Sequence, residues 1–268
     1  MIKDIGGKLH LMTQNERQWL AGWLEAEGSF VVDKNSPRIQ VCCIDLDTME
    51  KGAKIMGSSN IYPTKPCKFT KHQAYKMSVN GFHAIEIMLD ILPLMGERRT
   101  QKITNIILGF DPLFQHMIER PAETRELFWL IGWLEGEGYF GISNGTPIVS
   151  GNATDLDIVE SATALMSPDQ KYKIKSKKGL KIGYKSVYQI RIFSRQAAIL
   201  MRTILPWMSS RRSIRIKKAL THFDSIYERQ VKRIKNCWDD PQIRERMVNG
   251  IKESRKDKVK NSQAGFKG

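Results

Sequence analysis

Two short stretches of the chain repeat each other and decide its architecture. Residues Trp19–Phe30 read WLAGWLEAEGSF, and residues Trp129–Phe140 read WLIGWLEGEGYF, 110 positions further along. Such a repeat is informative before any local assignment, because a fixed offset indicates a duplicated structural unit.

Two more blocks recur in the same order around this motif. The offset is again 110 residues for the second block and 113 for the third, so the second copy carries a three-residue insertion. Three ordered matches indicate a tandem duplication. The recurring blocks are Trp19–Phe30 with Trp129–Phe140, Asp45–Asp47 with Asp155–Asp157, and Ile91–Arg99 with Ile204–Arg212.

The duplication divides the chain into three parts. We assign residues 1–112 to a first half, residues 113–222 to a second half, and residues 223–268 to a C-terminal extension. The extension has no counterpart in the first half, and it carries 12 basic against 7 acidic residues. It reads as an amphipathic stretch, Arg244–Ile251, followed by the basic tail Lys252–Lys260.

The residues of each copy predict the same first elements. Apolar side chains at helical spacing in Trp19–Leu24 predict a helix. Gly28 and Gly138 then stand where a left-handed C-terminal cap is expected. Alternation of apolar and open positions from Tyr139 to Ser143 predicts a strand with one buried face.

The rest of each copy completes an α+β unit. A second helix is predicted to begin near Asp45 or Asp155, both acceptable N-caps. Strands follow at Tyr75–Val79 and Tyr188–Ile192, and a last helix runs from each Arg-Arg pair to about residue 110 or 223. Each half is therefore αββαββα, with helices on one face of an antiparallel sheet.

Composition limits the classes of partner. The 268 residues include 43 Lys and Arg against 28 Asp and Glu, a formal net charge of +15. This excess favours a polyanion, nucleic acid first and an anionic membrane surface second. The start of the chain lacks a secretory signal, and the four cysteines show no metal-binding or disulfide spacing, so we expect an intracellular protein. Because the basic residues line strands rather than one helix face, we expect no membrane partner. An organelle, a microbial cytoplasm and a phage-encoded origin remain equally open.

The twin motif itself carries a chemical prediction. Small residues recur one turn apart, Gly22 with Ala26 and Gly132 with Gly136, which lets two helix backbones approach closely. Such packing brings the C-terminal ends of the helices together, and with them Glu27 and Glu137. Two carboxylates at the negative ends of two helices repel each other, and a divalent cation with oxygen ligands, Mg²⁺ rather than zinc, relieves that repulsion. Glu25 and Glu135 also repeat, with a surface or a salt-bridging role.

The motif resembles a known family. Leu20–Gly28 (LAGWLEAEG) and Leu130–Gly138 (LIGWLEGEG) are similar to the paired signatures of double-motif LAGLIDADG homing endonucleases, and the resemblance extends over about residues 15–222. It implies a monomer whose two sheets form a saddle over double-stranded DNA. It also implies site-specific hydrolysis of both strands with Mg²⁺, for which Mn²⁺ or Ca²⁺ can substitute in binding.

The resemblance also implies site residues. Glu27 and Glu137 match the acidic metal-binding position, and the preceding residues, Ala26 and Gly136, supply carbonyl ligands. Arg98 and Arg211 match the central basic position, where the family commonly has Lys. The adjacent residues Arg99 and Arg212 are rivals for that role.

Basic residues on predicted strands are the candidate DNA contacts. In Tyr172–Lys178 every second residue is Lys, so one face of a strand collects positive charge. We expect contacts to phosphates and base edges, because a two-stranded ribbon fits the major groove. Trp23, Trp133 and Phe30 are expected in the core instead. The candidate contacts are Lys34, Arg38, Lys76, Lys173, Lys175, Lys177, Gln189 and Arg191.

Two other functions suit the same fold. One is an intron RNA maturase, and the other is a catalytically silent DNA-binding regulator. Acidic residues retained in both motifs favour the nuclease over the regulator. The C-terminal extension is an extra DNA-binding arm or a disordered solubilising tail.

Overall fold

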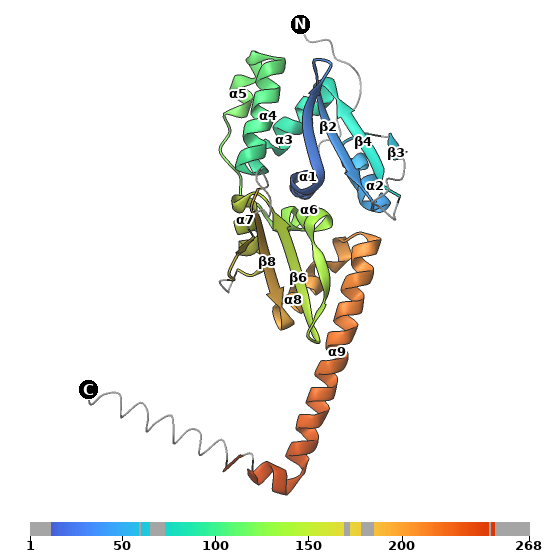
Figure 1. Ribbon diagram of the computed structural model, residues 1–268, viewed down its shortest axis with the longest axis vertical. Coiled ribbons are helices and arrows are strands. Elements are labelled where there is room, and N and C mark those ends of the chain that lie inside the picture. Colours follow the sequence, from blue (N-terminus) through green and yellow to red (C-terminus); the bar gives the residue numbers. More distant parts are fainter. Residues whose placement is uncertain are drawn as a thin grey trace, which may run out of the picture. The chain divides into compact units, whose positions relative to one another are not determined.

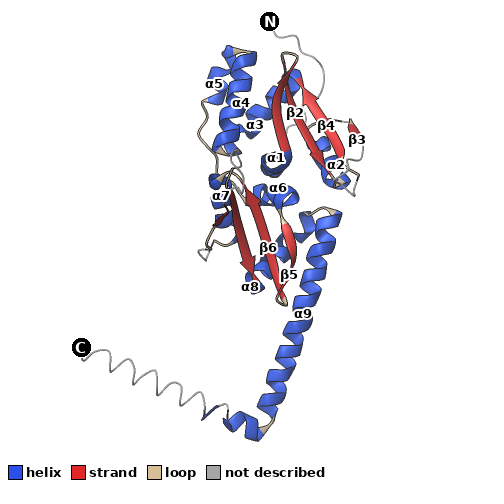
Figure 2. Cartoon of the chain, in the orientation of Figure 1, coloured by secondary structure: helices blue, strands red, loops and turns tan. Residues whose placement is uncertain are grey.

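The computed structural model describes residues 12–58, 60–64, 73–168, 172–177, 185–246 and 248–249. The chain forms two compact units, residues 1–220 and residues 221–268. The first unit contains both copies of the repeat, and each copy is an α+β arrangement around a four-stranded antiparallel sheet (Figure 2). The basic tail expected at Lys252–Lys260 lies outside the described residues.

The first copy begins with a helix held by a capping box, in which Thr13 and Glu16 bond reciprocally to each other's backbone N–H. A 3₁₀ turn at Leu92–Leu94 precedes its last helix. Its elements are α1 (Gln14–Glu27), β1 (Gly28–Asp33), β2 (Ser36–Cys43), α2 (Leu46–Ile55), β3 (Ile61–Pro63), β4 (Tyr75–Asn80), α3 (Gly81–Ile91) and α4 (Glu97–Phe110).

The second copy repeats this order after a linker that contains the short helix α5 (Gln115–Ile118). A 3₁₀ turn at Leu205–Trp207 again precedes the last helix. Its elements are α6 (Leu127–Glu137), β5 (Tyr139–Ser143), β6 (Thr146–Ala153), α7 (Leu156–Met166), β7 (Lys175–Lys177), β8 (Val187–Phe193), α8 (Ser194–Ile204) and α9 (Ser210–Asp239).

The two sheets have the same topology, with strand orders β1-β2-β4-β3 and β5-β6-β8-β7. Ile39, Val41, Met77 and Val79 alternate along β2 and β4 and are buried. The residues between them form the opposite, more open face of the sheet. The predicted strands at Tyr75–Val79 and Tyr188–Ile192 are thus confirmed as β4 and β8.

Helices α1 and α6 pack backbone against backbone between the two sheets (Figure 1). A Cβ atom placed on Gly22 would lie 2.0 Å from the Trp129 carbonyl oxygen, and one on Gly132 would lie 2.0 Å from that of Trp19. No side chain fits at either position. The predicted small-residue contact is therefore confirmed. Trp23, Trp133 and Phe30 lie in the core as expected, each at most 1 % exposed.

The prediction of left-handed caps at Gly28 and Gly138 is wrong. Both residues have extended backbone, with φ of −75° and −74°, and each leads directly from its helix into the next strand. The need for glycine is steric. A Cβ atom on Gly28 would lie 2.5 Å from the Leu24 carbonyl oxygen, and one on Gly138 would lie 2.3 Å from that of Leu134.

Several element boundaries also differ from expectation. Helices α3 and α8 were not predicted, although they cover the same part of each copy. Asp45 and Asp155 occupy the N-cap positions of α2 and α7, but neither side chain makes a capping hydrogen bond. Of the strand expected over Tyr172–Lys178, β7 contains Lys175–Lys177, and Lys178 lies outside the described residues. The Tyr172 hydroxyl donates to Gln196 in α8.

The last helix, α9, does not end near Phe223 but continues to Asp239, into the second unit. Tyr227, Val231 and Ile234 are exposed along it. Within the described part of the chain, no helix is both long and apolar enough to cross a lipid bilayer.

The glycine contact predicts a specific loss of stability. In Gly22→Ala the added methyl group meets a backbone carbonyl that cannot move without its helix, so the free energy of unfolding should fall by about 3 kcal/mol or more. Gly109→Ala in α4 is the matched control, because nothing lies within 4 Å of its Cβ position. That variant should be unchanged or up to about 1 kcal/mol more stable. Urea unfolding of both variants checks this, and equal stability would contradict the packing.

Candidate active site

The C-terminal ends of α1 and α6 bring Glu27 and Glu137 into one region. A Cβ atom on Gly136 would lie 2.4 Å from the Ala26 Cβ atom and 3.0 Å from the Glu27 Cγ atom. The four residues proposed as metal ligands, Ala26, Glu27, Gly136 and Glu137, therefore meet where the two helices end.

Both glutamates are held in surroundings that disfavour their charge. Burial and, next to it, the negative charge of Glu27 together raise the pKa of Glu137 to about 7. Burial also raises the pKa of Glu27, which the Arg212 guanidinium partly opposes. Two carboxyls of this kind are suited to a ligand that brings positive charge.

The other motif acids, Glu25 and Glu135, are buried and bind the start of the last helix in their own half. Glu25 Oε2 accepts from the Gly96 backbone N–H at 2.9 Å, and Glu135 Oε2 accepts from the Ser209 hydroxyl at 2.7 Å. Glu25 also forms an ion pair with Arg99 at 2.9 Å. Of the two roles left open for these acids, salt bridging is found for Glu25.

Arg99 and Arg212 turn inward, to the ends of the motif helices. Arg99 donates to the Gly28 carbonyl. Arg212 donates to the carbonyls of Glu135, Gly136 and Gly138. Burial lowers the pKa of both guanidinium groups. These two arginines therefore neutralise and tie down the negative helix ends.

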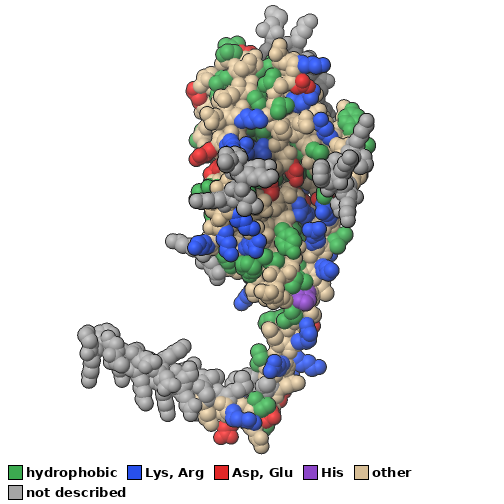
Figure 3. Space-filling view, in the orientation of Figure 1, with side chains coloured by type: hydrophobic (Ala, Val, Ile, Leu, Met, Phe, Trp, Pro, Cys, Tyr) green, Lys and Arg blue, Asp and Glu red, His purple; other side chains and the backbone are tan. Residues whose placement is uncertain are grey.

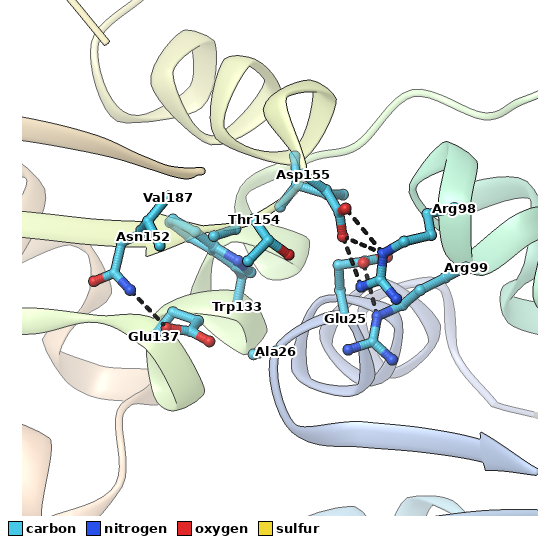
Figure 4. Close-up of a pocket in the computed structure, with 12 residues that line it drawn as sticks. Glu25, Ala26, Arg98, Arg99, Trp133, Glu137, Asn152, Thr154, Asp155 and Val187 are labelled. Carbon is cyan, nitrogen blue, oxygen red and sulfur yellow. Dashed lines mark hydrogen bonds and ion pairs between the residues drawn. The ribbon is translucent and has the colours of Figure 1, made fainter. Parts of the chain in front are cut away.

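Arg98 and Arg211 turn outward and pair with the opposite half. Arg98 Nε lies 2.9 Å from both carboxylate oxygens of Asp155, at the start of α7 (Figure 4). Arg211 donates to Asp45, at the start of α2, at 3.1 Å. The hydrogen bonds from Arg98 hold the pKa of Asp155 below its usual value.

Two cavities lie beside these groups, one for each motif glutamate. The first, of about 230 Å³, is lined by Glu137, Asn152, Asp155, Arg98 and Arg99 among others. The second, of about 200 Å³, is lined by Glu27, Cys43, Asp45, Arg211 and Arg212 among others. In each cavity, Glu137 or Glu27 and the aspartate come from one half, and both arginines come from the other.

The donor set fits a hard divalent cation only in part. Over the described ranges, no group of three or more His, Cys, Asp or Glu side chains is placed to hold a metal ion. Glu27 and Glu137 offer carboxylate oxygens, and the Gly136 carbonyl already accepts from Arg212 at 3.0 Å but retains a second lone pair. The two carboxylates suit Mg²⁺, which keeps several waters and binds substrate phosphate alongside one or two carboxylates.

Six of the eight candidate DNA contacts lie on the open faces of the two sheets, and Lys34 and Lys173 lie just outside the strands. In the first sheet Arg38 pairs with Asn80 across β2 and β4, Lys76 is exposed, and Lys34 sits in the β1–β2 turn. In the second sheet Lys175 faces Gln189, while Arg191 and Lys177 extend the same face. Lys173 lies just before β7 and is exposed. Lys and Arg side chains gather over β8 in Figure 3.

Three residues of these cavities were missed by the sequence analysis. Asp45 and Asp155 were interpreted as helix caps, although their recurrence at the motif's own offset was a usable signal. Asn152, whose Nδ2 donates to Glu137 Oε2 at 3.4 Å, gave no signal because its counterpart in the first half is Cys42.

The second cavity makes a testable prediction about cysteine reactivity. Burial, together with the charges of Glu27 and Asp45, raises the pKa of the Cys43 thiol to about 12. Cys43 should therefore react with iodoacetamide at pH 8 much more slowly than the exposed Cys42. Glu27→Gln removes one negative neighbour and should speed the alkylation of Cys43 but not of Cys42. Peptide mass spectrometry measures both rates, and equal rates in wild type would contradict the described cavity.

Comparison with known proteins gives matches in structure only. No protein-family model matches the sequence, and no curated protein matches it. The LAGLIDADG homing endonuclease I-GzeII in complex with its DNA target has a TM-score of 0.46 and 12% identity, over 80% of this chain and 91% of that chain. For the LAGLIDADG meganuclease I-AabMI bound to uncleaved DNA the values are 0.49 and 12%, over 80% and 92%.

The homing endonuclease I-WcaI, bound to its DNA recognition sequence, has a TM-score of 0.46 and 10% identity, over 76% of this chain and 86% of that chain. The solved structures that this chain matches include LAGLIDADG homing endonucleases, the family that its twin motif resembles.

Proposed function

We propose that the chain is a site-specific endonuclease that cuts both strands of double-stranded DNA. The observation that carries the proposal is the meeting of Glu27 and Glu137 at the ends of two tightly packed helices, each beside a cavity that also holds an arginine. Both sites come from one chain, which supports a monomeric enzyme.

Hydrolysis of a phosphodiester needs an activated water and stabilisation of negative charge on the phosphate. Glu27 and Glu137, with Ala26 and Gly136 as carbonyl donors, would hold the divalent ion. A bound Mg²⁺ supplies a water of lowered pKa and a Lewis acid for the phosphate oxygens. Arg98 and Arg211 stabilise the charge that develops on the phosphate in the transition state. Mn²⁺ or Ca²⁺ would substitute in binding.

Affinity comes from the sheets rather than from the acids. The open faces carry cations and amides, including Arg38, Lys76, Gln189 and Arg191, and a two-stranded β-ribbon fits the major groove. The acids at the junction repel phosphate. Cleavage and binding should therefore be separable by mutation.

The first test is a cleavage selection on a randomised DNA library with the purified chain, in Mg²⁺ and in EDTA. We expect site-specific double-strand breaks that require Mg²⁺. Glu27→Gln and Glu137→Gln should each lower the rate by orders of magnitude, because a neutral amide binds the ion poorly. Binding to the selected site in a gel-shift assay should be kept or improved.

Other outcomes identify other functions. Tight, salt-sensitive DNA binding with no cleavage by the wild type would indicate the regulator. Restoration of splicing of an intron RNA by the chain, without DNA cleavage, would indicate the maturase. Cleavage that survives both Glu→Gln variants would contradict the assignment of the two acids.

DNA binding should also depend on salt in a predictable way. If about six phosphates are contacted, log K should fall against log[salt] with a slope of about −5. Arg191→Ala removes one cation from the open face of β8 and should reduce the slope by about 1. The control is Lys54→Ala, on the exposed side of α2, which should leave the slope unchanged. If the two variants have equal slopes of log K against log[salt], Arg191 does not contact the DNA backbone.

A further inference from the structure

Two ion pairs cross between the halves at equivalent positions. Arg98 in α4 of the first half binds Asp155 of the second through contacts of 2.9, 2.9 and 2.7 Å. Arg211 in α9 of the second half binds Asp45 of the first at 3.1 Å. The two aspartates are equivalent in the duplication, and so are the two arginines.

Each pair lies in the cavity of a motif glutamate. Arg98 and Asp155 line the cavity that contains Glu137, and Figure 4 shows Arg98 extending from α4 toward the start of α7. Arg211 and Asp45 line the cavity that contains Glu27. In each cavity the glutamate and aspartate come from one half, and this outward-facing arginine comes from the other.

Holding the halves together does not explain these pairs. The arginine side chains are 45% and 39% exposed, although the aspartates are only 15% and 10% exposed, so solvent screens much of what each pair adds to stability. The interface already has the α1–α6 contact. It also has a second pair of crossing bonds, from Glu97 N–H to Asp157 at 3.0 Å and from Ser210 N–H to Asp47 at 2.6 Å.

Orientation is a better explanation. An arginine side chain has four rotatable bonds, and a carboxylate that grips its guanidinium fixes both the position and the plane of that group. A charged group that stabilises a transition state must be held in place before the reaction. Asp155 grips two nitrogens of Arg98, whereas Asp45 is bound through one nitrogen of Arg211.

We propose that Asp155 and Asp45 are positioning residues, each of which holds the arginine of the opposite half beside the motif glutamate of its own half. Each strand of the DNA is then cut by a site composed of both halves. This inference rests on the proposed endonuclease function. It implies that Asp155→Asn slows cleavage of one strand and Asp45→Asn slows cleavage of the other.

One arm of the test needs no DNA. Phenylglyoxal modifies free guanidinium groups, and mass spectrometry reports the rate at each arginine. Arg98 should be modified severalfold faster in Asp155→Asn than in wild type. The matched control is Asp157→Asn, which removes the charge of the neighbouring crossing acceptor but no hydrogen bond to Arg98. An unchanged rate in Asp155→Asn would overturn the claim that this pair holds the arginine.

The other arm follows each strand separately, on a duplex carrying the selected site with a different label on each strand. Asp155→Asn should cut one strand roughly 10–100-fold more slowly, the cost of a misplaced catalytic group, so that a nicked product accumulates. Asp45→Asn should accumulate the opposite nick. Binding affinity should not change, and Asp47→Asn and Asp157→Asn should keep the wild-type strand ratio. Asp155→Glu should recover part of the lost rate.

The two proposals fail in different ways. If the wild type cuts neither strand of any site, the endonuclease function fails, and the catalytic part of this inference fails with it. If the wild type cuts both strands while Asp155→Asn and Asp157→Asn keep the same strand ratio, only the positioning role is overturned. Thermal unfolding of all five variants identifies any that are misfolded. If Asp155→Asn is misfolded, the strand ratio of Asp155→Glu decides the positioning claim for Arg98.

Discussion

The contact between two helix backbones at Gly22 and Gly132 is the constraint on which the rest of the structure depends. Because each glycine faces a tryptophan carbonyl of the other helix, α1 and α6 come closer than side chains normally permit. The two sheets that follow these helices then lie on opposite sides of the helix pair (Figure 1). The motif glutamates at the two helix ends are thereby brought into one region. Packing of the core thus sets the distance between the candidate catalytic groups.

Such closeness has an electrostatic cost, and the arginine pair after each Leu-Pro block offsets it. The inner arginines, Arg99 and Arg212, bind the carbonyls at the helix ends, where the helix dipole is negative. The outer arginines bind aspartates of the opposite half. Because the inner and outer arginine of each pair are adjacent on one helix, the contact of the inner arginine also fixes the position of the outer arginine. Stability and the candidate chemistry are therefore linked through neighbouring residues of α4 and of α9.

Sequence alone predicts what repeats and what is periodic. The duplication gave the two halves, the small residues gave the helix contact, and alternation gave β4 and β8. Gly28 was misassigned because a glycine required by a close carbonyl looks the same in sequence as one required by positive φ. The pairing of Arg98 with Asp155 joins residues 57 positions apart in different halves, and no local pattern encodes it. The inward and outward directions of adjacent arginines likewise depend on tertiary packing.

The two cavities have equivalent acids and arginines, but the other residues that line them differ. Trp23 packs on Gly52 of α2, whereas its counterpart Trp133 packs on Gly151 of β6. Glu137 accepts a hydrogen bond from Asn152, whereas the cavity of Glu27 is lined by the Cys43 thiol. These wall contacts each join residues of one half, whereas each crossing ion pair joins residues of both. Under the proposed function, the two DNA strands would therefore meet cavities with different walls. The acids and arginines beside the two strands would be equivalent.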